Sequence, residues 1–64
     1  MRPGDLVRVA SPCTGERTLK RYDAGELGVI IKKVHDDGSA WTVLIAGRFE
    51  VFGLHMLERV DETR

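Results

Sequence analysis

The sequence predicts an all-β protein in which about five short strands wrap into one small, strongly bent barrel. The 64-residue chain alternates short runs of apolar and β-branched residues with turn residues. These runs are too short for confident helices, and strands this short cannot form a two-sheet sandwich with enough core. There are no repeats and no linker, so residues 1–64 are interpreted as a single domain.

The first half of the chain contains two of the predicted strands. Residues 5–10, "DLVRVA", follow a Pro-Gly turn and predict a half-buried strand, with Val7 and Val9 on one face and Leu6, Arg8 and Ala10 on the other. Residues 26–34, "ELGVIIKKV", place apolar side chains on both faces, which predicts a bulge or strong bend near Gly28. Residues 35–40, "HDDGSA", contain the Asp-Gly pair of a hairpin turn.

The second half supplies the remaining strands. Residues 41–46, "WTVLIA", and 48–52, "RFEVF", flank a tight turn at Gly47. Residues 53–57 suit a single 3₁₀ turn, and residues 57–60, "LERV", can return as a last strand before a polar, frayed tail at 61–64. The predicted core is Leu6, Val7, Val9, Leu27, Val29, Ile31, Val43, Ile45, Val51, Leu54 and Leu57, with Trp41 at least partly covered.

The long segment 11–25 is the first candidate for a contact site. Long loops in compact domains are usually functional or disordered. Here Arg17, Lys20, Arg21 and Tyr22 offer charges and an aromatic face to a partner rich in carboxylates or phosphates. The alternative is a mobile, solvated hairpin whose charges only maintain solubility.

An apolar anchor is the second candidate. Trp41 either contacts a partner or covers an open end of the core. Within residues 51–57, Phe52 and Met56 are predicted to form an exposed patch of the kind found at interfaces, although Met56 can also fill a gap in the core.

The charge distribution bears on the kind of partner. Formal net charge is zero, but residues 1–33 carry seven basic and four acidic residues (+3), and residues 34–64 carry three and six (−3). Proteins that bind nucleic acid normally show a basic surplus. The asymmetry either produces a two-signed surface suited to a protein partner or a homo-oligomer, or is cancelled when the strands mix.

Residue types with catalytic potential lack the spacing that chemistry requires. His35 and His55 have no evident partner, Cys13 has no assigned base, and Asp36 with Asp37 precede a turn glycine. We therefore expect no enzyme activity, metal, cofactor or small-molecule substrate. The single cysteine fits a reducing compartment, and the chain shows neither a signal peptide nor an apolar run of membrane-spanning length, so a cytoplasmic location is expected.

The order of these features resembles a known group of proteins. An opening "PGDLVRV", then "GELGVI", "TVLI" and a closing "LHMLERV" are similar to the small Src-homology-3-like (SH3-like) barrels, over nearly the whole chain. That superfamily includes KOW modules, the electron-donor-docking small subunits of photosynthetic complexes, and short phage-encoded barrels. The resemblance implies that segment 11–25 corresponds to the RT loop, which helps to build the ligand groove in this fold.

Three functions are compatible with these observations. The first is a non-catalytic protein-docking module, an accessory or structural subunit of a larger assembly, phage-encoded and located in the virion. The second is a KOW-like RNA- or DNA-binding module, which would use Arg17, Lys20, Arg21, Lys32, Lys33 and Trp41. The third, by analogy with the photosynthetic subunits, is docking of an acidic electron-carrier protein on the basic half.

Overall fold

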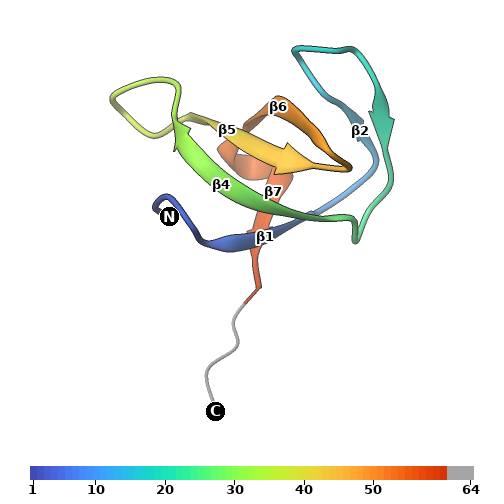
Figure 1. Ribbon diagram of the computed structural model, residues 1–64, viewed down its shortest axis with the longest axis horizontal. Coiled ribbons are helices and arrows are strands. Elements are labelled where there is room, and N and C mark those ends of the chain that lie inside the picture. Colours follow the sequence, from blue (N-terminus) through green and yellow to red (C-terminus); the bar gives the residue numbers. More distant parts are fainter. Residues whose placement is uncertain (61–64) are drawn as a thin grey trace.

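The computed structural model describes residues 1–60, which form an all-β domain with one short 3₁₀ helix (Figure 1). The predicted strands and the 3₁₀ turn are confirmed, while the tail predicted at 61–64 lies outside the described residues. Two further short strands occur inside the long segment. The elements are β1 (Leu6–Val9), β2 (Cys13–Thr14), β3 (Arg21–Tyr22), β4 (Leu27–Lys33), β5 (Ala40–Ile45), β6 (Arg48–Gly53), η1 (Leu54–Met56) and β7 (Leu57–Arg59).

The main sheet has five antiparallel strands in the order β6-β5-β4-β1-β7, and β2 pairs with β3 in a separate hairpin. Its two edges, β6 and β7, are joined only by the three residues of η1. A flat five-stranded sheet would be about 19 Å across, whereas three 3₁₀ residues span about 6 Å. The sheet must therefore curl, as Figure 1 shows.

The predicted closed barrel is not formed within residues 1–60, because no pairing joins β6 to β7. The chain between these strands turns through η1. The free edge of β6 instead receives a hydrogen bond from the long segment, donated by the Glu16 amide to the Val51 carbonyl at 3.2 Å. The described architecture is thus a curled, open sheet.

Both predicted hairpin turns are confirmed. Gly38 adopts a φ of 75° between β4 and β5. Ala46 and Gly47, with φ values of 52° and 74°, form a two-residue turn between β5 and β6, and two successive positive φ angles are typical of a type I′ hairpin. The bulge expected near Gly28 is present in β4, but it lies further along the strand, between Ile30 and Lys32.

The core lies on the concave face of the sheet. It contains Val7, Val9, Tyr22, Ile30, Trp41, Val43, Ile45, Phe52 and Leu57. The rings of Tyr22 and Phe52 meet edge to face with centroids 5.6 Å apart. The side chain that decides the composition of this core is Glu50, which is fully buried on the same face.

The core prediction was wrong on β4 and β6. On β6, Glu50 and Phe52 face inward, so Val51 lies on the outer face and is only half-buried. On β4, Ile30 is buried opposite Val43, and Val29 and Ile31 are half-buried. Leu27 and Leu54 are exposed, and Leu6 is half-buried.

Candidate docking surfaces

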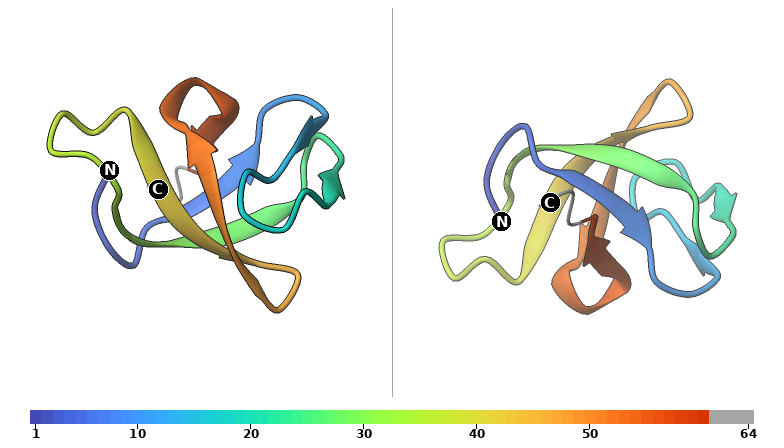
Figure 2. Two further views of the ribbon diagram at one scale, coloured as in Figure 1. Left: turned by 90° about the horizontal axis from the view of Figure 1, so that it is seen from above. Right: turned by 90° about the horizontal axis from the view of Figure 1, so that it is seen from below.

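The long segment is an ordered hairpin. Cys13 pairs with Tyr22 and Thr14 pairs with Arg21, and beyond them the Gly15 amide donates to the Lys20 carbonyl at 2.9 Å. The Leu19 amide closes the end of the hairpin by donating to the Gly15 carbonyl at 3.0 Å. In Figure 2 the hairpin lies at one end of the molecule in both views, beside β6.

The Glu50 carboxylate on β6 holds this hairpin. It accepts hydrogen bonds from the backbone amides of Arg17 (3.3 Å) and Thr18 (3.1 Å), from the Thr18 hydroxyl, and from the Tyr22 hydroxyl (2.9 Å). The backbone of Gly15 lies so close that a Cβ there would overlap the carboxylate. A buried charge is tolerated only when it is well bonded, and these bonds meet that requirement.

The protonation states of Glu50 and Tyr22 follow from this contact. Burial alone would raise the pKa of Glu50, but hydrogen bonds from Thr18, Tyr22 and the Arg17 amide outweigh it, and the pKa lies below its usual range. Burial, followed by the contact with the Glu50 carboxylate, raises the pKa of Tyr22. Glu50 is therefore ionised and Tyr22 protonated near neutral pH.

The outer side of the hairpin is exposed and basic. Arg17, Lys20 and Arg21 are exposed, as a contact site requires. Leu19 is the most exposed large apolar side chain among residues 1–60, at 75%, and has a φ of 62°. The expectation that Tyr22 offers an aromatic face was wrong, because its ring is buried between Phe52 and Glu50.

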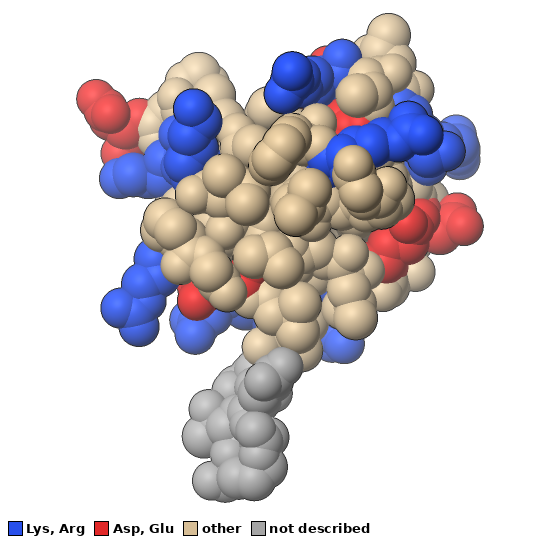
Figure 3. All heavy atoms as spheres, in the orientation of Figure 1, with Lys and Arg blue, Asp and Glu red and all other residues tan. Residues whose placement is uncertain are grey.

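A row of apolar side chains crosses the convex face of the sheet. The strand register places Leu6 beside Val29, Val29 beside Leu44, and Leu44 beside Phe49, across β1, β4, β5 and β6. Phe49 is 48% exposed and Leu44 is 38% exposed. We call these four residues the outer apolar row. Figure 3 shows that the centre of this side of the molecule holds few charged side chains, which lie mainly around its rim.

The exposed apolar patch predicted for Phe52 and Met56 within residues 51–57 is not formed. Phe52 is only 1% exposed and pairs with Trp41 on the core face, because Glu50 determines which face of β6 turns inward. Met56 is half-buried and packs against the core, which was the alternative interpretation. The exposed phenylalanine of β6 is instead Phe49, which the alternation of the strand placed opposite Phe52.

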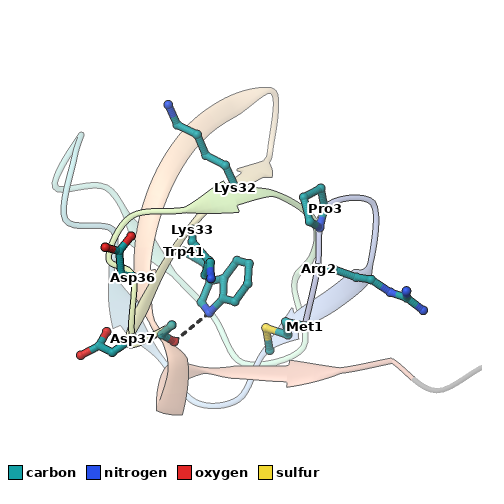
Figure 4. Close-up of a pocket in the computed structure, with 9 residues that line it drawn as sticks. Met1, Arg2, Pro3, Lys32, Lys33, Asp36, Asp37 and Trp41 are labelled. Atoms are coloured by element: carbon teal, nitrogen blue, oxygen red, sulfur yellow. Dashed lines mark hydrogen bonds between the residues drawn. The ribbon is translucent and has the colours of Figure 1, made fainter.

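A pocket of about 420 Å³ lies at the other end of the molecule, next to the N-terminus and residues 36–38. Trp41 and Met1 point into it, and the charged ends of Arg2 and Lys32 point away (Figure 4). The Trp41 indole donates to the Gly38 carbonyl at 2.9 Å. Trp41 is therefore a core residue that shows one edge to a mainly apolar pocket.

The predicted nucleic-acid residues fall into two separate groups. Arg17, Lys20 and Arg21 belong to the hairpin at one end, whereas Lys32, Lys33 and Trp41 lie where β4 and β5 meet the 34–39 connection at the other end (Figure 2). The structure does not bring the six residues together on one surface.

The remaining candidate residues have local explanations. Burial raises the pKa of the half-buried Cys13 thiol, which disfavours the thiolate. The Asp37 carboxylate accepts a hydrogen bond from the Ser39 amide at 2.9 Å, and this bond lowers the Asp37 pKa, as expected for a turn aspartate. Within residues 1–60, no group of three or more His, Cys, Asp or Glu side chains is arranged to hold a metal ion.

The two oppositely charged halves of the chain are mixed by the β1–β7 pairing. Arg8 contacts Glu58 at 2.7 Å, and Asp5 lies 3.8 Å from Arg59. Each contact joins a residue of the first half to one of the second, so charges of opposite sign are neighbours here. Such exposed pairs contribute little to stability, but they favour the interpretation in which the asymmetry is cancelled.

No protein-family model, curated protein or solved structure matches this chain. Across the described residues, no helix has the length and apolar character needed to cross a membrane.

Proposed function

We propose that the protein is a non-catalytic docking module, an accessory or structural subunit that attaches to a larger protein assembly through the convex face of its sheet. The outer apolar row carries this proposal. When one face of an antiparallel sheet is solvated, its side chains are normally polar. Here Leu6, Val29, Leu44 and Phe49 stand side by side across four strands instead.

The size of the patch supports attachment rather than self-sufficient dimerisation. Leu27 lies on the same face as the row and is 55% exposed. Leu27, Leu44 and Phe49 together expose on the order of 250 Å², slightly less than the roughly 300–600 Å² of the largest apolar patch on a typical monomer. A stable complex usually buries about 800 Å² on each partner. The row is therefore suited to be one part of a larger interface with another protein.

The finer fold assignment, an SH3-like barrel, belongs to the same proposal. It is supported by the return of β7 to β1, by the 3₁₀ helix before β7 and by the long hairpin between β1 and β4. A phage virion is the assembly we favour. That choice rests on the sequence resemblance to short phage-encoded barrels alone.

The test produces wild type and two variants in separate cells and compares the size of the complex in which each protein elutes from its cell extract. We expect wild type to co-elute with a complex much larger than the free chain in size-exclusion chromatography. The double variant Leu44→Lys/Phe49→Lys should elute as the free chain, because a lysine on each of two neighbouring strands makes the face charged. Leu54→Lys, an equally apolar-to-charged change in η1, is the matched control and should stay in the complex.

Two results would contradict docking through this face. One is a double variant that remains in the large complex while circular dichroism shows it to be folded. The other is a wild-type chain that elutes free at every concentration tested.

A further inference from the structure

We infer that the tip of the β2–β3 hairpin, residues 16–21, is a second and preformed contact that inserts Leu19 into an apolar pocket on an acidic protein partner. The inference rests on the docking function but uses a different surface from the outer apolar row. It assigns a role to the most exposed large apolar residue among residues 1–60, which neither the core nor the sheet accounts for.

Leu19 occupies its position against both of the usual preferences of leucine. Its side chain is 75% exposed, and its φ of 62° lies in the left-handed region. That region is normally occupied by glycine, asparagine or aspartate, because a Cβ crowds the following carbonyl there. A hairpin selected only for solubility would be expected to carry one of those residues. Strained backbone positions cluster at functional sites, and this one displays an apolar side chain to solvent.

The tip is held in shape before any partner arrives. Glu50, itself fully buried, binds the amides of Arg17 and Thr18 on the N-terminal side of Leu19. The Gly15–Lys20 and Leu19–Gly15 backbone hydrogen bonds close the other side. A surface ordered in advance loses less conformational entropy on binding, so even a single inserted side chain can contribute to affinity.

The charges around Leu19 select the partner. Residues 16–21 carry three basic side chains and one acidic side chain, a net charge of +2, on a protein of net charge zero. Arginine and lysine at the edge of an apolar contact fit carboxylates on the opposite surface. The complementary partner is therefore a protein with an apolar pocket bordered by Asp and Glu.

The same observations argue against a nucleic acid at this tip. Proteins that bind single strands stack bases on aromatic side chains. The nearest aromatic ring in the hairpin, Tyr22, is buried, and Trp41 is buried at the opposite end of the molecule. An aliphatic Leu19 offers no stacking surface.

The test selects a displayed library of random peptides on the immobilised protein. We expect wild type to enrich peptides in which apolar residues are flanked by Asp or Glu. Leu19→Asn should reduce their binding at least tenfold, because asparagine tolerates the left-handed conformation but removes the apolar side chain. Leu54→Asn, the same change at an exposed leucine of η1, outside both the tip and the convex face, is the matched control and should bind as wild type. Leu19→Asn should keep the wild-type melting temperature or exceed it.

Three outcomes would overturn the inference: no enriched consensus, a consensus without acidic residues, or equal enrichment on wild type and Leu19→Asn. A single-stranded DNA oligonucleotide that binds wild type and Leu19→Asn equally at low salt would also overturn it. The folded Leu44→Lys/Phe49→Lys variant should enrich the same peptides as wild type, so failure of the tip and failure of the sheet face give different results.

Discussion

The burial of the two faces of β6 is the reverse of what hydrophobicity predicts, because the face with the charged residue is turned inward. The inner face contains a charged residue, Glu50, beside Phe52, and the outer face contains Phe49 and Val51. The Glu50 carboxylate is thus fully buried, while Phe49, the residue just before it on the opposite face, is 48% exposed. The difference teaches that the available partners, rather than polarity alone, determine which face of this strand turns inward.

Partners for the carboxylate come from the hairpin. Thr18 and Tyr22 supply hydroxyl donors, and the backbone of residues 17 and 18 supplies amides. With these donors the cost of burying Glu50 is offset, and Phe52 gains a place against Tyr22. The outer face has no such constraint, and it is the face through which we propose that a partner protein binds.

The largest expected effect comes from truncating the two phenylalanines of β6 in turn. Phe52→Ala should cost about 3–5 kcal/mol, because it leaves a cavity in the core. That is close to the whole stability of a domain of this size, so the chain should be largely unfolded at 25 °C. Phe49→Ala, the matched change on the outer face, should cost less than about 1 kcal/mol.

Urea unfolding followed by circular dichroism measures both, with the milder Phe52→Leu included so that a folded inner-face variant is available. Equal costs for Phe49→Ala and Phe52→Ala would contradict the face assignment.

The next effect concerns the buried carboxylate. Glu50→Gln should cost about 2–3 kcal/mol, because the neutral amide accepts fewer and weaker hydrogen bonds from Thr18, Tyr22 and the hairpin backbone. Relative to wild type, Glu50→Gln should accelerate amide hydrogen exchange more at residues 15–20 than in the strands β4 and β5. A matched change at an exposed carboxylate, Glu58→Gln, should alter stability by less than about 0.5 kcal/mol. A Glu50→Gln variant as stable as wild type would mean that the carboxylate does not hold the hairpin.

The smallest effect is the dependence of stability on pH. The pKa of Glu50 is lower in the folded chain than in the unfolded chain, where it is about 4.3. The stability contributed by the ionised group is therefore complete above that unfolded value and is lost as the pH falls through the folded pKa. The stability difference between wild type and Glu50→Gln should shrink on acidification below about pH 5, by at most about 1.4 kcal/mol per pH unit. Urea midpoints of the two proteins across this range measure it, and parallel curves would refute it.

Much of the secondary structure could be predicted from local sequence. The alternation in residues 5–10, the Asp-Gly pair at 37–38 and the glycine at 47 led to β1 and to both hairpins, because turn chemistry and strand alternation act over a few residues. The 3₁₀ turn at η1 was predicted in the same way. The exposed hairpin residues Arg17, Lys20 and Arg21 were also identified as candidates, although their role stays a prediction.

Two of the errors arise from one long-range contact. Phe52 was predicted to lie in an exposed patch and Tyr22 to offer an aromatic face to a partner, whereas both are buried beside Glu50. Glu50 lies 32 residues from Thr18 in the chain, so no local pattern connects them. Leu19 was missed because no sequence pattern indicates that a leucine will be exposed with a positive φ.

What the sequence determined by itself is where the five strands of the main sheet lie, where the hairpins turn, and that alternate residues within a strand share a face. Those properties depend on backbone preferences and on neighbours a few positions away. Only the tertiary structure decided which face of β6 is buried, how the long segment is ordered, and which apolar residues remain on the surface. These depend on whether donors from a distant segment reach one carboxylate, and that can occur only after the sheet has curled and brought the hairpin against β6.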